Sequence, residues 1–202
     1  MDKEFLERWY IRGKKSVRDI ARFSHCSDGK VNYWLQKYSI PKRSISEAIY
    51  SKHNPKGDPF AALQVNRDSF IFGLGLGLYW GEGTKRNSGQ VRLGNTDPYL
   101  VRSFILFLRK AYAIDESRLR FALQIFRDMD QTKEERFWQT FLKVSAKKFY
   151  KTINTRSGSI GTYREKSKHG VLTIYFNNKK LRDILVAEIE KMKELGYTAP
   201  VR

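Results

Sequence analysis

The feature that most constrains the fold is a glycine-rich apolar run near the middle of the chain, SFIFGLGLGLYWGEGTK, at 69–85. Gly73, Gly77 and Gly81 recur at intervals of four, with Ser69 one turn earlier, so a helix would place these small residues on one side. Large apolar side chains would cover the remaining sides, which predicts a helix buried all round. Its interior glycines together destabilise such a helix by roughly 3–4 kcal/mol. We therefore expect a second backbone to pack closely along the small residues and compensate.

The same run has one competing interpretation as local structure. Glycine and leucine alternate from Gly73 to Leu78, so the segment could be a strand with a flat glycine face. The length of the run and its single β-branched residue, Ile71, favour the helix. Phosphate-binding loops are excluded, because the glycine spacing matches neither the dinucleotide-binding fingerprint nor a Walker loop.

An acid follows this helix directly. Glu82 stands between Gly81 and Gly83, where the helix dipole disfavours a carboxylate. In a two-fold dimer through the small residues, the two copies of Glu82 would converge and would need a divalent cation or a shared proton. The alternative is a solvated glutamate beside a capping glycine.

Charge and composition narrow the partner class. The net charge is +18 and is spread along the whole sequence, while 41% hydrophobic residues exclude a disordered basic tail. A folded basic surface favours nucleic acid as the partner, with solubility or anionic lipid as the alternative. One cysteine and three histidines exclude a disulfide framework and a Cys/His zinc site. We find no secretion signal or membrane span, and expect a cytoplasmic protein without a small-molecule cofactor.

The first fifty residues predict three short helices. In the first helix, apolar residues recur at helical spacing and the pattern ends at Gly13. Ser16 and Asp19 form a capping box for a second helix over 16–23. Ser27 or Asp28 can cap a third helix, which runs to Tyr38. The segment 3–44 resembles the helix-turn-helix of resolvases and transposases. As a recognition helix, the third would present to DNA the outward residues Lys30, Asn32, Tyr33 and Lys37, followed by a basic arm with Lys42 and Arg43. A three-helix bundle with a merely solvated outer face is the alternative.

The remaining sequence divides at a linker. The segment 51–65 contains the proline- and glycine-rich stretch SKHNPKGDP, which separates a domain at 1–50 from one at 66–202. Beyond the apolar helix the pattern predicts three strands and three helices. The strands are expected at 90–94, 119–125 and 171–176, the helices at about 97–112, 133–144 and 179–192, and a basic loop at 147–168.

The run from Gly75 to Gly83 resembles the nine-residue motif of LAGLIDADG homing endonucleases. Gly77 matches the packing glycine, Gly81 the small alanine and Glu82 the metal-binding acid of that motif. Two positions depart from it, because Trp80 replaces the first aspartate and Gly75 the opening leucine. The likeness spans roughly 66–193 and implies an αββαββα domain, here with an extra inserted helix, so the predicted fold class is α+β.

The resemblance also implies a function. Single-motif members of the family are homodimers across the motif helix, which would place Gly73, Gly77 and Gly81 at the interface. They cleave double-stranded DNA, so Glu82 and the Gly81 carbonyl would hold Mg²⁺ or Mn²⁺. Lys85 would assist at the scissile phosphate as a catalytic residue, with Arg86 beside it.

The strand faces would then meet the DNA major groove. The residues expected there are Gln90, Arg92, Arg120, Gln124, Thr173 and Tyr175. The predicted function is a sequence-specific, metal-dependent DNA endonuclease. The alternatives are a cleavage-inactive transcription regulator derived from the same family and an RNA-binding or splicing cofactor.

Overall fold

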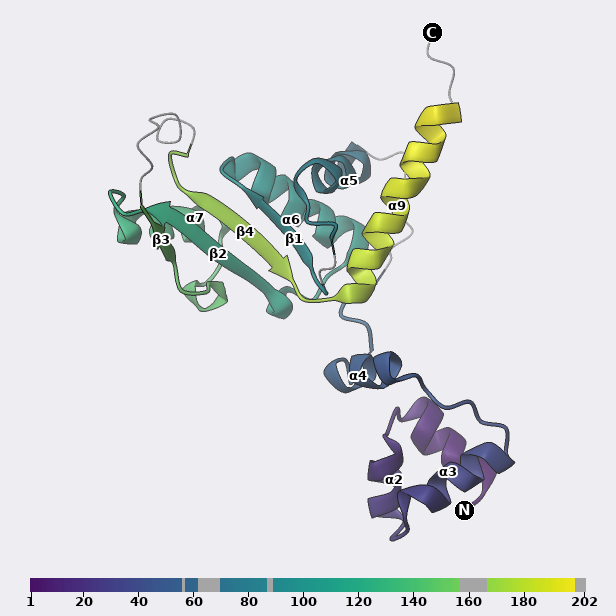
Figure 1. The fold of residues 1–202 in the computed structure, drawn as a ribbon. Coiled ribbons are helices and arrows are strands. Elements are labelled where there is room, and N and C mark those ends of the chain that lie inside the picture. The colour runs from purple at the N-terminus through teal and green to yellow at the C-terminus, as the bar shows by residue number, and fades with distance from the viewer. Residues whose placement is uncertain (56, 62–69, 87–88, 157–166, 199–202) are drawn as a thin grey trace. The chain divides into compact units, whose positions relative to one another are not determined.

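The computed structural model describes residues 1–55, 57–61, 70–86, 89–156 and 167–198 (Figure 1). The chain divides into two compact units, Met1–Pro59 and Phe60–Arg202, and the division falls inside 51–65. The predicted α+β class is confirmed, because helices accompany a four-stranded mixed sheet. None of the helices in the described ranges is long and apolar enough to cross a membrane.

Short capped helices build the N-terminal unit. Ser16 caps α2 through a capping box with Asp19, and Ser27 caps α3 by accepting from the amide of Lys30. Both caps confirm the sequence prediction, and α2 and α3 each bury apolar residues in one small core. The elements are α1 (Lys3–Leu6), a π-helical turn η1 (Glu7–Arg12), α2 (Val17–Phe23), α3 (Asp28–Lys37) and α4 (Ile45–His53).

The first described element of the C-terminal unit is the glycine-rich helix, which decides against the strand interpretation. Asp97 caps the next helix and Pro98 occupies its first turn, as predicted. The elements in chain order are α5 (Phe70–Glu82), β1 (Val91–Asn95), α6 (Pro98–Tyr112), η2 (Glu116–Arg118), β2 (Leu119–Phe126), α7 (Gln131–Leu142), η3 (Ala146–Lys148), β3 (Ile153–Thr155), β4 (Val171–Phe176) and α9 (Lys179–Thr198).

The four strands form one sheet in the order β1-β4-β2-β3. β4 lies between β1 and β2 and is antiparallel to both, whereas β3 adds to the far edge of β2 in parallel. Side chains of alternate residues on β2 and β4 enter a core that they share with α5, α6, α7 and α9. Helices thus cover one face of the sheet, and Figure 1 shows the other face open among the described residues.

The element order differs from the expected αββαββα arrangement. Among the described residues the order is αβαβαββα, because the Asp97-Pro98 cap starts α6 directly after β1 and separates β1 from β2. The helix beyond the expected pattern is therefore α6, and it lies between the first two strands rather than before the last ones. The basic loop at 147–168 also contains β3, whose three residues gain their strand conformation by pairing with β2.

The expectation that α5 is buried all round is wrong for the single chain. Phe72, Leu76 and Tyr79 are buried against the core, but the side with Gly73 and Gly77 is exposed. Phe70, Leu74 and Trp80 on that side are 79, 38 and 42% exposed. The helix is therefore apolar all round but packed on one side only. Ser69 lies outside the described residues.

Candidate nucleic-acid interface

The open face of the sheet carries side chains in rows that cross the strands. The pairing register aligns Arg92 of β1 with Tyr175 of β4, and Tyr175 with Arg120 of β2. Because paired residues point to the same face, these three side chains form one row. The structure thus brings together three residues that the sequence predicts to contact DNA. We call this the arginine row.

Ring contacts organise the arginine row. The Arg92 guanidinium lies over the Tyr175 ring, with Cζ 5.3 Å from the ring centroid, and Tyr150 packs edge-on against Tyr175 at 5.7 Å. Arg120 donates from Nη1 to the carbonyl oxygens of Ser117 at 2.6 Å and Leu119 at 2.9 Å. The two cations are therefore held at either side of a tyrosine by contacts within the unit.

Two further rows follow along the strands. Gly94, Thr173 and Ala122 form a row of small side chains, in which a Cβ on Gly94 would lie 2.9 Å from the Thr173 hydroxyl. We call this the small row. Val171, Gln124 and Ile153 form the next one, the glutamine row, where Gln124 is exposed. The predicted residues Gln124 and Thr173 thus share the open face, and Gln90 lies half-buried just before β1.

The C-terminal end of α5 is attached to the edge of this sheet. Gly83 forms an antiparallel bridge with Leu93, and the Thr84 amide donates to the Arg92 carbonyl at 2.9 Å. A side chain at Gly83 would overlap Tyr79, so the tight exit from the helix requires glycine. Glu82 itself is exposed at the last residue of α5. Its position beside β1 is therefore fixed by backbone hydrogen bonds on its C-terminal side.

Tyr79 supports the same turn from inside. Its hydroxyl donates to the Thr84 carbonyl at 3.0 Å, and its ring stacks on Phe104 with centroids 5.8 Å apart. Burial raises the pKa of Tyr79. The charge of Arg182 lowers this pKa by a smaller amount, and the charge of Asp183 raises it. The phenol therefore stays protonated at neutral pH and acts as a fixed donor under the acid-bearing turn.

The predicted lysine lies close to the acid along the chain. The Lys85 ammonium donates to the Trp80 carbonyl in the last turn of α5. The backbone carbonyl of Lys85 accepts a hydrogen bond from Arg182 of α9. Lys85 therefore neutralises part of the helix C-terminus. Arg86 is exposed just beyond it. The structure places both cations within four residues of Glu82.

The exposed glycines have open space around them. Among the described residues, a Cβ built on Gly73, Gly77 or Gly81 meets nothing within 4 Å, other than the helix's own neighbouring backbone. The fourth glycine, Gly75, faces the opposite way, where a Cβ would overlap the Phe107 ring. Three of the four glycines therefore leave a smooth exposed strip along α5, which we call the glycine face, and it ends at Glu82.

A metal site within one chain is not evident in the described residues, because they contain no group of three or more His, Cys, Asp or Glu side chains that could hold an ion. Glu82 supplies one carboxylate, and the Gly81 carbonyl is a possible second oxygen ligand. Hard oxygen donors suit Mg²⁺ or Mn²⁺ in kind. A two-fold pair of α5 helices would bring a second set of the same donors.

In the N-terminal unit, α3 presents the residues predicted to bind DNA. Lys30 and Lys37 are exposed, Tyr33 is 58% exposed, and Asn32 is half-buried. The Lys37 ammonium lies 4.6 Å from the centroid of the Trp34 ring, which holds it against the helix. The outer surface of α3 therefore combines cations, an amide and an aromatic ring.

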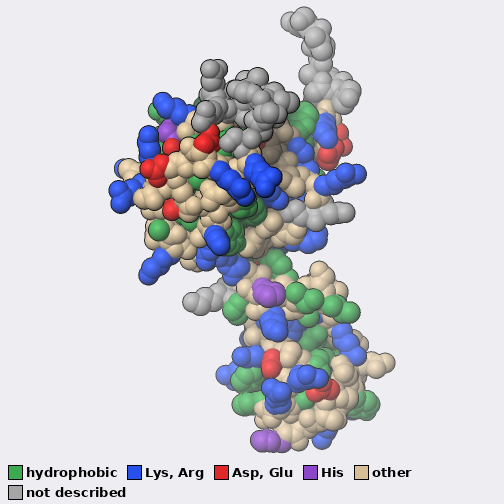
Figure 2. All heavy atoms as spheres, turned by 60° about the vertical axis from the view of Figure 1, so that its left-hand side comes forward, with side chains coloured by type: hydrophobic (Ala, Val, Ile, Leu, Met, Phe, Trp, Pro, Cys, Tyr) green, Lys and Arg blue, Asp and Glu red, His purple; other side chains and the backbone are tan. Residues whose placement is uncertain are grey.

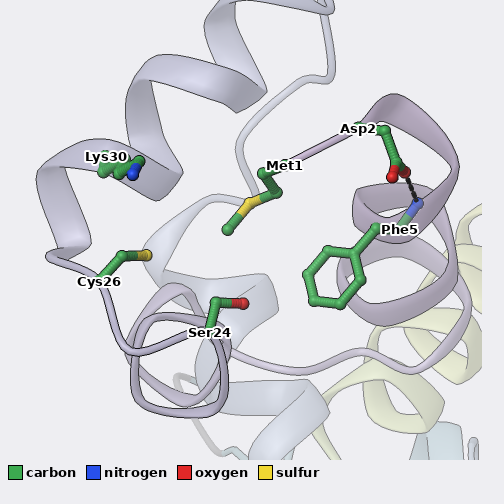
Figure 3. A pocket seen from close by; sticks show the side chains of 6 residues that line it. All are labelled: Met1, Asp2, Phe5, Ser24, Cys26 and Lys30. Atoms are coloured by element: carbon green, nitrogen blue, oxygen red, sulfur yellow. Dashed lines mark hydrogen bonds between the residues drawn. The ribbon is translucent and has the colours of Figure 1, made fainter.

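A shallow cavity of about 210 Å³ lies at the start of α3. Figure 3 shows Lys30 and Cys26 on one side of it and Phe5 on another, with the Asp2 carboxylate accepting from the Phe5 amide at 2.7 Å. Met1 and Ser24 complete its lining. Lys30 therefore lies at the rim of this cavity as well as on the outward surface predicted for DNA.

The two residues of the predicted basic arm, Lys42 and Arg43, have different surroundings. Arg43 donates to the carbonyl oxygens of Lys14 and Lys15, its guanidinium lies 4.3 Å from the Tyr10 ring centroid, and its amide donates to the Tyr10 hydroxyl. Arg43 thus fastens the chain after α3 to the end of η1. Lys42 next to it is exposed. Figure 2 shows Lys and Arg side chains distributed over both units.

Sequence reasoning missed Tyr150. It lies in the predicted basic loop, and its amide donates to the Phe121 carbonyl at 2.8 Å, which brings the ring to Tyr175. No local pattern indicates this contact, because it depends on a partner 29 residues earlier. A tyrosine within a run of lysines is the single available signal.

Comparison of the chain with protein-family models, with curated proteins and with solved structures finds no match, so the site rests on its own geometry.

Proposed function

We propose that this chain is a sequence-specific DNA-binding protein that acts, as a homodimer, as a metal-dependent double-strand endonuclease of the LAGLIDADG type. In this proposal the N-terminal unit is a helix-turn-helix that binds DNA, and the C-terminal unit carries cleavage. The observation that carries the proposal is the glycine face of α5, which is exposed, apolar and free of side chains, and which ends in the exposed Glu82 at the edge of an open polar sheet.

The glycine face supports the dimer. Exposed Phe70, Leu74 and Trp80 beside three glycines form an apolar surface that is costly to leave in water. A second copy of α5 would bury these side chains and approach closely over the glycines. The same two-fold arrangement would bring both Glu82 carboxylates to one end of the helix pair.

Different residues of the chain would then have separate roles in phosphodiester hydrolysis. Glu82 and the Gly81 carbonyl from each copy would hold the divalent cation, which supplies Lewis-acid activation of water and neutralises charge on the phosphate. Lys85 and Arg86 would bind the phosphate next to Glu82. The arginine row and the residues beyond it would orient the duplex across the open sheet face.

Substitution of the acid separates binding from cleavage. Glu82→Gln is nearly isosteric, so α5 should persist, while the loss of the carboxylate should reduce DNA cleavage by at least about 1000-fold in Mg²⁺ or Mn²⁺. DNA affinity should be unchanged or slightly higher, because two negative charges per dimer are removed. The measurement is cleavage of a plasmid library, with gel shift on the same DNA.

Glu190→Gln is the matched control, because it removes an exposed carboxylate from α9 of the same unit. It should cleave like the wild type. Full cleavage by Glu82→Gln would overturn the catalytic assignment. A wild-type protein that binds specific DNA and never cuts it would identify the regulator derived from the same fold.

A further inference from the structure

We propose that the rows of the open sheet face read DNA in a fixed order, with guanine at the arginine row and adenine at the glutamine row about four base pairs away. This inference rests on the proposed function and adds a base preference to it. It depends on the strand register, which assigns each side chain to a row, and on the contacts that hold Arg92 and Arg120 in place.

The width of the major groove sets the direction of the rows. The groove is about 12 Å wide and strands are about 4.8 Å apart, so two or three strands fit across it. The strands must therefore run along the groove, and successive rows must follow the base pairs. Rows on one face are two residues apart, about 6.6 Å along a strand, which corresponds to about two base-pair steps of 3.4 Å.

The arginine row suits guanine. A guanidinium donates two parallel hydrogen bonds to the O6 and N7 atoms of guanine, a pairing that no other base offers in the major groove. Arg92 is exposed and lies over Tyr175, whose ring is in turn supported by Tyr150. Arg120 is held by the carbonyls at the start of β2. Restricted side chains lose less entropy on binding, so both arginines are prepared for directional contacts.

The other two rows have different chemistry. The small row presents the methyl groups of Thr173 and Ala122 beside Gly94, a shallow surface that donates no bidentate pair and can contact a thymine methyl. Gln124 in the glutamine row can donate to N7 and accept from the N6 amino group of adenine. Two row intervals separate Arg92 from Gln124, so the guanine and adenine positions should lie about four base pairs apart.

The test is selection of bound sequences from a randomised duplex library with the full chain. The wild type should select sites with a guanine and an adenine at this separation. Arg92→Lys keeps the charge and loses the planar fork, so it should lower the preference for guanine by about tenfold. Gln124→Ala should relax the adenine position by a similar factor and leave guanine selected. Arg136→Lys, on the exposed side of α7 in the helix layer, is the control and should select the wild-type site.

The outcomes distinguish the inference from the proposed function. A wild-type protein that selects no sequence from duplex DNA would overturn both. A wild-type protein that selects a site which Arg92→Lys and Gln124→Ala leave unchanged would overturn the row assignment alone. Circular dichroism of each variant checks that it is folded. If Arg92→Lys does not fold, Arg120→Lys tests the same row, with the same tenfold loss expected.

Discussion

Gly75 and Gly77 lie two residues apart on α5 and meet different surroundings. A Cβ on Gly75 would overlap Phe107, which is fully buried and held by the rings of Phe72 and Tyr112 at 5.8 and 5.6 Å. A Cβ on Gly77 meets nothing within 4 Å in the part of the chain that the structure describes. One glycine is therefore required by the fold of the unit, whereas the other is free to serve a partner.

This contrast predicts opposite effects of the same substitution. Gly75→Ala should lower the free energy of unfolding by about 1–3 kcal/mol through overpacking. Gly77→Ala should leave it unchanged or raise it by up to about 1 kcal/mol, because alanine favours the helix. Urea unfolding followed by circular dichroism measures both. Equal destabilisation by the two alanines would contradict the packing described for α5.

At the same scale, the sequence predicts which side chains are on the sheet face better than it predicts their contacts. Alternation along β2 and β4 is sufficient to assign Arg120, Gln124, Thr173 and Tyr175 to one face. The role of Arg43 could not be predicted, because its carbonyl partners lie 28 and 29 residues earlier in the chain. Local pattern fixes orientation, and tertiary contact fixes the partner.

At the scale of the element, α5 ends at Glu82, a residue on its exposed side. We expect Gly77→Leu to convert the proposed dimer to a monomer, because a leucine would hold two facing backbones apart. In the single chain the new side chain has open space, so the unit should stay folded. Analytical ultracentrifugation of the wild type and the variant measures the change. An undisturbed Gly77→Leu dimer would show that the glycine face is not the interface.

Glu116 connects the end of α6 with the short helical turns η2 and η3. Glu116 of η2 accepts from Arg109 of α6, and its carbonyl accepts from Lys148 of η3 at 2.8 Å. The hydrogen bond from Arg109 holds the pKa of Glu116 below its ordinary value of 4.5, with a smaller contribution from the charge of Lys148 and against partial burial. The ionised form therefore stabilises the fold above about pH 4.5, and this stabilisation is lost as the pH falls through the lower folded-state pKa.

We expect Glu116→Gln to cost about 0.5–1 kcal/mol at pH 7, a small value because the pair is partly solvated. The difference from the wild type should diminish below pH 4.5. Denaturant unfolding at several pH values measures it, and an Arg109→Met background is the control, in which most of the effect should disappear. A difference that does not diminish as the pH falls below 4.5 would show that Glu116 acts by packing.

Elements with strong local signals were predictable, and those that depend on a neighbour were not. The Asp97-Pro98 cap starts α6 at the predicted residue, and β4 has the predicted bounds. β3 was missed because three residues carry no periodic signal and pair with a strand about 30 residues away. The exposure of one side of α5 was also not predicted, because the apolar composition of a helix does not show whether the surface that packs on it belongs to the same chain.

At the scale of the whole molecule, the chain has two units with separate hydrophobic clusters, and both units contribute to its positive net charge. The net charge of +18 is distributed over both, with Lys and Arg exposed on α3 and on the sheet face. In the proposed function the two units are DNA-binding modules joined by a linker, and together they would bind DNA with an affinity above that of either, because the second contact forms at high effective concentration. The N-terminal unit should therefore add affinity and length to the recognised site.

Deletion of residues 1–50 tests this arrangement. The remaining chain retains every residue of the larger cluster and should stay folded. Specific DNA affinity should fall by about 100-fold, and its dependence on salt should weaken because fewer phosphates are neutralised. Cleavage at saturating protein should persist, because Glu82 and the sheet are intact. Gel shift at two salt concentrations with the selected site measures the loss. An unchanged affinity and sequence preference would show that α3 does not read DNA, and would leave recognition to the sheet alone.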